Sequence, residues 1–332
     1  MNEELSNKLR IAGFICTVMV LYRHSLNYMA FFNSWTGFGI NKVIQGSTLN
    51  FTEIAVPFFF IVSGFFFFKR SYYSIESYRR MIEKKFRSLF VPFLIWNILG
   101  MFILLVVSDY GRIGDSILVC VENLFYSRWN GPLWYIRDLM IMMMFVFVYN
   151  WVFIVNKIWL YGFIALLLYF YWIPVDTNLL SSEGMFFFFV GGIISKNDKI
   201  LRKRIPVYMM WILVVLWIYI SMDSIILRNI YLHRCNTIIG ICAFWQLLNY
   251  IPDNLKCSML KYSSYSFLIY VMHPYMIKII KNSVAYFFFG NEQVALVTFI
   301  ILPIMVTFII IYIGGYWKKF SCKTYDIVTG NR

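Results

Sequence analysis

Residues 11–32 read IAGFICTVMVLYRHSLNYMAFF, an apolar segment long enough to cross a bilayer that nonetheless contains Arg23 and His24. Ionisable groups at membrane depth are costly, so they usually face a protein interior or a wet cavity and mark a functional site. Arg10 precedes His24 by 14 residues, and at about 100° per residue it returns to within roughly 40° of the same helix face. The alternative is that His24 and its neighbour simply extend toward lipid headgroups.

The composition is that of a polytopic membrane protein. Hydrophobic residues make up 61% of the 332 positions and charged residues only 14%, whereas soluble domains are roughly 45–50% apolar. The net charge of +14 does not indicate a nucleic acid partner, because Lys and Arg collect in the cytoplasmic loops of membrane proteins. The six cysteines form no CxxC pair and no cluster with His, so no metal site or disulfide framework is predicted.

Apolar runs predict an all-α integral membrane protein with about ten transmembrane helices. The expected spans lie near 11–32, 51–68, 88–107, 133–155, 158–174, 184–195, 206–222, 235–251, 263–282 and 294–316. With ten spans, the basic loops fall on one side together with both ends of the chain, which predicts cytoplasmic N- and C-termini. The sixth span is short, and it is expected to be tilted or broken at Gly191 and Gly192.

No internal repeat, soluble domain or low-complexity linker is visible in the sequence. Residues 1–332 are therefore expected to form a single membrane-embedded domain without a fused soluble domain. The first apolar segment is too long for the apolar region of a signal peptide, so we expect it to be retained.

Five short stretches occur in order across most of the chain. They are LRIAGFICTVMVLYRHS at 9–25, VPFFFIVSGFFFFKR at 56–70, KKFRSLFVPFLIW at 84–96, GPLWYIRDLMI at 131–141 and YSFLIYVMHPYMI at 265–277. Each stretch alone is short and mostly apolar, but the occurrence of all five in this order is specific. Together they resemble the successive signatures of the membrane acyltransferase 3 family.

This resemblance implies an integral membrane enzyme that moves an acyl group, commonly acetyl, from a cytoplasmic donor such as acetyl-CoA to a carbohydrate hydroxyl. It implies no bound cofactor beyond this donor substrate. The family histidine assigned to chemistry matches His24. In the family, a basic residue usually precedes this histidine with ten residues between the two. The corresponding position here is Gly13, and the nearest cations are Arg10 and Lys8.

The chemistry of acyl transfer fits the same residues. A base must take the proton of the hydroxyl, and positive or hydrogen-bonding groups must stabilise the oxyanion. An imidazole in a partly dry site suits the first task. We expect His24 to be the general base, with Arg10 or Arg23 as electrostatic support.

A basic run, YRRMIEKKFR at 78–87, lies on a predicted inner loop. Its cations can bind the phosphates of CoA, but topology or attraction to anionic lipid would demand the same run. The resemblance favours Arg87 individually, because Arg87 belongs to the family phrase before Pro92. The candidate donor-binding residues are Arg79, Arg80, Lys84 and Arg87.

Other polar residues lie within predicted spans. Adjacent residues such as Arg137 and Asp138 do not face each other on a helix, so each is expected to have a partner on another segment. This pair has two possible roles. It can form structural contacts between helices, or it can bind the acceptor together with Trp134. His273, before Pro274, resembles the second histidine of the family, and either acceptor binding or a structural kink is possible.

Two further positions receive structural interpretations. His233 lies at a predicted outer boundary and is interpreted as interfacial. Ser63 and Gly64 are interpreted as permitting close helix packing, because no GxSxG motif surrounds Ser63.

The sequence thus predicts a multi-pass inner-membrane O-acetyltransferase that acts on a cell-envelope or secreted polysaccharide. Its expected partners are acyl-CoA, a carbohydrate acceptor, the bilayer and polysaccharide-synthesis proteins. An exporter of a glycan or glycolipid also has many helices and intramembrane charges, and it is the alternative from another class. A scaffold within a polysaccharide-synthesis complex is a third possibility.

Overall fold

The computed structural model describes residues 3–33, 39–69, 74–106, 114–145, 157–173, 180–222 and 229–331, without the side chains of 157–159. Within these ranges the secondary structure is helical, with no strand. The chain divides into two compact units, and each is described by itself. Unit 1 comprises Met1–Phe59 and Asp198–Ile313, and unit 2 comprises Phe60–Asn197 and Gly314–Arg332.

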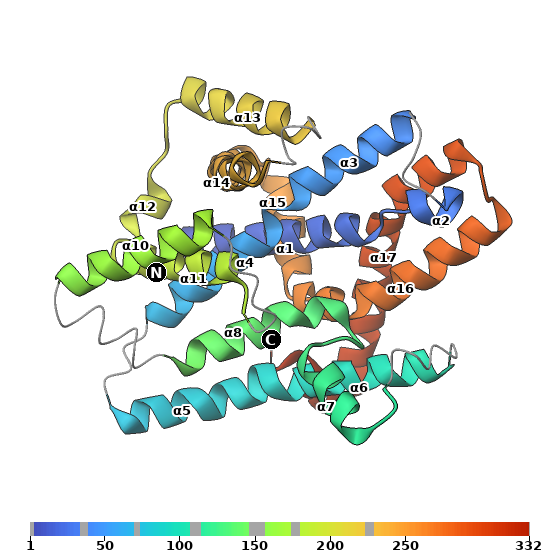
Figure 1. Cartoon of the computed structure of the whole chain (residues 1–332), viewed down its shortest axis with the longest axis horizontal. Coiled ribbons are helices and arrows are strands. Elements are labelled where there is room, and N and C mark those ends of the chain that lie inside the picture. The colour runs from blue at the N-terminus through green and yellow to red at the C-terminus, as the bar shows by residue number, and fades with distance from the viewer. Residues whose placement is uncertain are drawn as a thin grey trace. The chain divides into compact units, whose positions relative to one another are not determined.

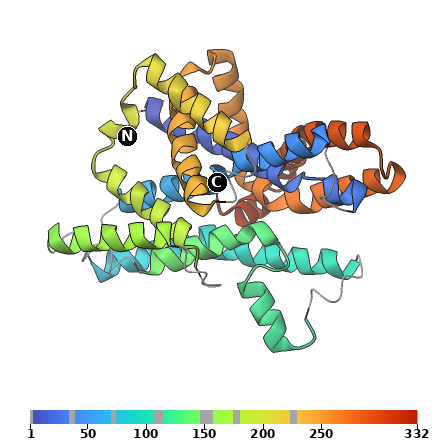
Figure 2. The ribbon, with the colours of Figure 1, turned by 45° about the horizontal axis from the view of Figure 1, so that its top comes forward.

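Unit 1 is built around the N-terminal helix. Its helices are α1 (Glu3–His24), α2 (Tyr28–Phe32), α3 (Ile40–Thr52), α12 (Lys199–Arg202), α13 (Val207–Met222), α14 (Ile230–Leu247), a 3₁₀ turn η5 (Leu248–Tyr250), α15 (Asp253–Ser263) and α16 (Ser266–Phe287), with the first part of α4 (Ala55–Phe68) and most of α17 (Glu292–Phe320). α1 packs against α3, α15 and α16 (Figures 1 and 2). This packing puts the end of α1 in contact with segments far along the chain.

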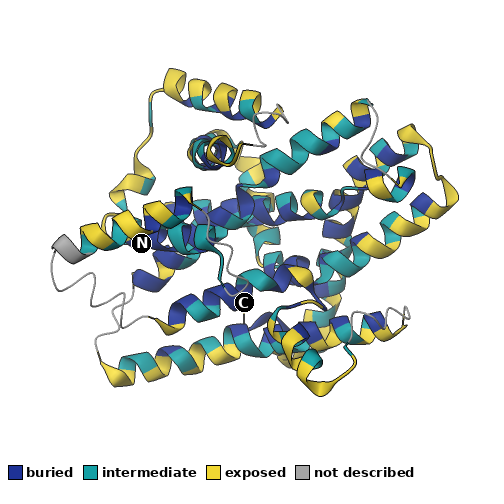
Figure 3. Ribbon diagram, in the orientation of Figure 1, coloured by how far each residue is buried: buried dark blue, intermediate teal, exposed yellow. Residues whose placement is uncertain are grey.

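Burial differs sharply between the helices of unit 1 (Figure 3). Along α1 the buried positions cover more than one face, because Leu9 and Cys16 lie on one side and Ile11 and Phe14 on the other. In contrast, α13 exposes large apolar side chains along most of its length, including Trp211. Large exposed apolar side chains on a helix suit contact with lipid rather than with water.

Unit 2 contains the helices α5 (Ile75–Lys85), α6 (Val91–Val106), α7 (Ile117–Phe125), α8 (Trp134–Met144), α10 (Lys157–Trp172), α11 (Ser182–Lys196) and α18 (Cys322–Thr329), with the π-helix η1 (Phe86–Phe90) and the 3₁₀ turn η3 (Gly131–Leu133). The prediction that residues 78–87 form a loop was wrong, because α5, η1 and α6 follow one another without a break. Ser74 and Ser77 form a capping box at the start of α5, and such a box stabilises a helix N-terminus.

α11 also corrects the sequence analysis. It runs without interruption through Gly191 and Gly192, so the expected break is absent from this helix. The reason is packing, because a Cβ atom at Gly191 would lie 2.0 Å from the carbonyl oxygen of Ile61 in α4. The same holds at Gly64, where a Cβ atom would lie 1.8 Å from the carbonyl oxygen of Phe188. The interpretation of Gly64 as a close-packing residue is confirmed.

Four helical stretches among the described residues are long and apolar enough to cross a membrane. By length and composition these are Glu3–Phe32, Ile40–Phe68, Ile75–Val106 and Glu292–Phe320. The shorter apolar helices are Leu160–Trp172 and Val207–Met222. The fold is therefore that of a helical membrane protein, while the count of about ten spans and the cytoplasmic termini stay predictions, as does the single domain.

The contact between α4 and α11 leads to a matched prediction. Gly191→Ala is expected to lower the free energy of unfolding by about 1–3 kcal/mol, because the new methyl group collides with backbone atoms that cannot rotate away. Gly162→Ala in α10, where no atom of the described residues lies within 4 Å of the new Cβ position, is expected to raise the same free energy by up to about 1 kcal/mol. Unfolding of both purified variants in one detergent measures the difference, and equal stability would contradict the close packing.

Candidate functional site: two histidines at the end of the first helix

The last residue of α1 lies beside the second intramembrane histidine. The ring centroids of His24 and His273 are 5.0 Å apart, and the rings are tilted by 58°. His273 lies in α16 and is fully buried. The structure therefore brings together the two histidines that the sequence singled out, although they are far apart in the chain.

The hydrogen bond of His273 fixes which ring nitrogen can accept a proton. Its Nδ1 lies 3.1 Å from the carbonyl oxygen of Ile269. A carbonyl oxygen only accepts, so Nδ1 donates, and Nε2 is then the acceptor of the neutral ring. This Nε2 is buried and has no hydrogen-bond partner among the residues that the structure describes. An unsatisfied buried acceptor costs about 1–3 kcal/mol, so a bound hydroxyl at this point would be stabilised.

Lys281 fixes the backbone on which His24 sits, and the sequence analysis missed it. Its Nζ donates to the carbonyl oxygens of His24 (3.3 Å) and Leu26 (3.0 Å). A cation is favourable here, because the last carbonyls of a helix lack partners and carry partial negative charge. The available signal was a lysine inside the apolar α16, eight residues after His273.

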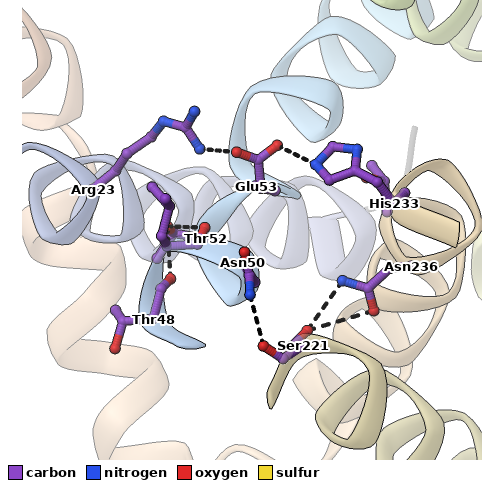
Figure 4. A network of polar contacts seen from close by, with 10 residues as sticks. Arg23, Thr48, Asn50, Thr52, Glu53, Ser221, His233 and Asn236 are labelled. Atoms are coloured by element: carbon purple, nitrogen blue, oxygen red, sulfur yellow. Dashed lines mark hydrogen bonds and ion pairs between the residues drawn. The ribbon is translucent and has the colours of Figure 1, made fainter. Parts of the chain in front are cut away.

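Arg23 points to a different set of partners from His24, because neighbours on a helix are about 100° apart. It forms an ion pair with Glu53, whose other carboxylate oxygen lies 2.8 Å from Nε2 of His233 (Figure 4). His233 is therefore not only interfacial. Its contact with Glu53 joins α14 to the C-terminal end of α3, and Arg23 joins both to α1. The role of Arg23 in supporting an oxyanion stays a prediction.

A second polar link binds α3 to α13 and α14 in the same view (Figure 4). Asn50 Nδ2 donates to the carbonyl oxygen of Ser221 at 2.8 Å. Asn236 Nδ2 donates to the hydroxyl oxygen of Ser221 at 3.1 Å. These bonds hold the elements that carry Glu53 and His233 beside each other.

The turn after His24 is closed by a buried amide. Oε1 of Gln45 in α3 accepts from the backbone N–H groups of Asn27 (2.9 Å) and Tyr28 (3.1 Å). Nε2 of Gln45 donates to the side-chain oxygens of Asn27 and Asn41, each at 2.6 Å. Gln45 thus uses both of its polar atoms, and it fixes the chain direction directly beyond His24.

The structure does not bring Arg10 to His24. The two residues are 14 positions apart in one unbroken helix, which corresponds to about 21 Å along the axis. Arg10 donates instead to the carbonyl oxygen of Leu260 at 3.2 Å. Sharing a face was the right inference from periodicity, but it is compatible with opposite ends of a helix.

In unit 2 the expectation for Arg137 and Asp138 was wrong in part. Nε and Nη2 of Arg137 both donate to Oδ1 of Asp138, at 2.9 and 2.7 Å. The backbone N–H of Ser181 donates to Oδ2 of Asp138 at 2.9 Å. Adjacent residues can pair because the long Arg side chain folds back, and Asp138 also has the predicted partner on another segment. The Trp134 ring lies 6.2 Å from that of Phe60.

The basic residues of α5 divide into two groups. Arg79 pairs with Glu83 at 3.0 Å, and Arg80 pairs with Glu76, each within one turn of the helix. Lys84 and Arg87 are exposed. Exposed pairs of this type contribute little to stability, and Lys84 and Arg87 are the better placed of the four to bind an external anion. Anion binding at these residues stays a prediction.

The arrangement of His24 and His273 suits proton transfer without a metal ligand set. Among the described residues, no group of three or more His, Cys, Asp or Glu side chains is placed to hold a metal ion. Two imidazoles at the meeting of two apolar helices, with one ring nitrogen free to accept, can bind a hydroxyl group and take its proton. The class of protein defined by the fold and site is therefore a helical membrane protein in which a partly buried histidine lies beside a fully buried one.

The family follows from the sequence comparison. A family profile described as an acyltransferase domain, of the acyltransferase 3 type, matches residues 10–314. The chain belongs to this family, and its activity is that of a membrane acyltransferase. No curated protein and no solved structure matches the chain.

The contacts of Gln45 predict its contribution to stability. Gln45→Leu is expected to lower the free energy of unfolding by about 3 kcal/mol, because buried donors and acceptors around Asn27 lose their partner. Gln293→Leu replaces an exposed glutamine of α17 and is expected to change it by less than about 0.5 kcal/mol. Thermal unfolding of both variants in the same detergent tests this. A small effect for Gln45→Leu would mean that the turn beyond His24 is held in another way.

Proposed function

We propose that the protein transfers an acetyl group from acetyl-CoA to a hydroxyl of a cell-envelope or secreted polysaccharide, from a position in the cytoplasmic membrane. The observation that carries the proposal is the pair of His24 and His273, whose rings lie 5.0 Å apart. Polysaccharide-synthesis proteins would supply the acceptor. The acceptor's hydroxyl is the group that this pair is suited to bind.

The proposed reaction uses the two histidines in different roles. Nε2 of His273 accepts a hydrogen bond from the hydroxyl and orients it. The hydroxyl oxygen attacks the thioester carbonyl while His24 takes the proton as general base. The C–S bond then breaks, and the proton passes to the sulfur of the departing CoA. The products are an ester on the sugar and a free thiol.

The neighbours of His24 have positioning roles in this proposal. Lys281 and Gln45 hold the backbone on either side of the α1 terminus. Arg23 forms an ion pair with Glu53 and so anchors the end of α1. Misplacement of a catalytic group by about 1 Å can cost about 100-fold in rate, which gives these contacts a functional reason.

The catalytic proposal predicts that His24→Ala lowers acyl transfer at least about 100-fold, because general base catalysis contributes factors of that size. The acetyl content of the surface polysaccharide is measured by proton NMR, in cells with equal membrane abundance of each variant. Cells that express the His273→Ala variant are expected to lose the acetyl signal of the polysaccharide as well. His233→Gln, which changes the third histidine away from the proposed reaction, should keep most of it.

Two outcomes would contradict the proposal. Unchanged acetylation in His24→Ala would remove the general base assignment. Unchanged acetylation with polymer retained inside the cell would instead identify an exporter. Loss of acetylation with the amount of exported polymer unchanged supports the enzyme and identifies the modified sugar.

The donor side makes a separate prediction. Replacing Lys84 and Arg87 together by Gln is expected to raise the KM for acetyl-CoA about tenfold, because charge-assisted hydrogen bonds to phosphate are lost, and to leave kcat nearly unchanged. The matched control replaces Lys319 and Lys323, which are also exposed, by Gln. Equal KM values for the two double variants would mean that the basic end of α5 serves topology or lipid attraction.

A further inference from the structure

Within unit 2, the helix α18 lies against the π-helix η1 and the helix α6. The residues that match the family profile end at 314, so α18 (Cys322–Thr329) lies outside the matched region. The proposed reaction assigns no role to this helix. Its contacts nevertheless involve η1, the turn that contains Arg87, which is one of the candidate donor-binding residues.

A buried hydrogen bond attaches α18 to α6. Tyr325, Val328 and Thr329 form the buried side of α18. The carbonyl oxygen of Val328 accepts a hydrogen bond of 2.9 Å from Nε1 of Trp96, which is buried in α6. No water is available at a buried site to replace a lost donor, so the loss of this bond would be costly. The end of α18 is therefore held at one place on α6.

The end of α18 also touches the backbone of η1. The N–H of Asn331 donates to the carbonyl oxygen of Asp326 at 2.7 Å, and the N–H of Gly330 donates to that of Ile327 at 3.3 Å. These two bonds form a Schellman motif, which favours glycine because its φ is positive, here 71°. A Cβ atom at Gly330 would overlap the carbonyl oxygen of Ser88 in η1 and would lie 2.9 Å from its carbonyl carbon. Glycine thus permits direct contact between the two backbones.

The geometry of η1 determines the direction in which the basic end of α5 faces. A π turn has hydrogen bonds between residues i and i+5, so it contains about one residue more than an α turn. One residue corresponds to about 100° of rotation about the helix axis. If η1 relaxed to an α-helix, α5 would rotate by about this angle relative to α6. Lys84 and Arg87, which are both exposed, would then present their charges in another direction.

We propose that α18 holds η1 in its π geometry and thereby keeps Lys84 and Arg87 in the orientation that binds the phosphates of acetyl-CoA. Trp96 and Gly330 are then positioning residues for the donor, because they act through η1. This inference rests on the proposed function, in which Lys84 and Arg87 bind the donor. Isolated π turns within α-helices are frequent at functional sites, and the contacts with α18 support this one from the side.

The main test is Gly330→Ala in the full chain. The new methyl group should displace the end of α18 from η1 and raise the KM for acetyl-CoA about fivefold, while kcat stays nearly unchanged. Amide hydrogen exchange in residues 322–329 should accelerate at least fivefold, because the helix loses protection when its contacts open. Gly290→Ala is the matched control. Gly290 has φ +79°, and no atom of the described residues lies within 4 Å of its new Cβ position, so this variant has similar backbone strain and should change neither quantity.

Trp96→Phe is the milder variant, because it keeps an aromatic ring and removes only the donor to Val328. It should accelerate the same exchange and raise the KM for acetyl-CoA about threefold. Lys323→Gln, on the exposed side of α18, should change neither. When Lys84 and Arg87 are both replaced by Gln, adding Gly330→Ala should raise KM by less than twofold, because residues that act through one another are not additive.

Three results would overturn the inference. The first is a fivefold rise in KM that persists without Lys84 and Arg87, because α18 would then act on another part of the donor site. The second is faster exchange of α18 with an unchanged KM. The third is unchanged exchange in both Gly330→Ala and Trp96→Phe. Failure of the donor proposal is distinguishable from all three, because the variant without both cations would then itself have the wild-type KM.

Discussion

The end of α1 depends on one constraint, which is that polar groups inside an apolar bundle must find their partners within the chain. Gln45, Glu53 and Lys281 meet this requirement from three directions. Each bonds to α1 or to the turn that follows it. Because unsatisfied buried groups cost about 1–3 kcal/mol each, the helix terminus that carries His24 has few alternative positions. The same bonds that satisfy the backbone also determine where the imidazole lies.

One exception to this rule lies beside His24. The carbonyl oxygens of His24 and Leu26 accept from Lys281, yet Nε2 of His273 is buried and bonds to none of the residues that the structure describes. Its ring is oriented by the bond from Nδ1 to the carbonyl oxygen of Ile269, so the unsatisfied atom is an acceptor at a fixed place. Proteins tolerate such a cost mainly where a ligand or a reaction uses it. This is why the histidine pair, and not the larger Arg23–Glu53–His233 network, is the proposed centre of chemistry.

The helices of unit 2 pack closely at one place and leave a cavity at another. Gly64 and Gly191 let the backbones of α4 and α11 approach closely, while the wall between α5 and α8 leaves a cavity lined by methionine and phenylalanine. Tight contact and open space thus occur in the same unit. Small residues favour the first arrangement, because van der Waals contact between backbones stabilises helix pairs in lipid. Flexible side chains favour the second, because they tolerate different occupants.

The sequence by itself determined that the chain is a helical membrane protein, assigned it to the acyltransferase 3 family and singled out His24 and His273. Hydrophobic length, composition and ordered motifs are local properties, and they need no knowledge of contacts. Only the tertiary structure decided which residues meet. It paired His24 with His273 and Arg23 with Glu53, introduced Lys281 and Gln45, and placed Arg10 at the far end of α1. Periodicity gives the face of a helix on which a residue lies. It gives neither the depth nor the partner, because these depend on how segments hundreds of residues apart pack together.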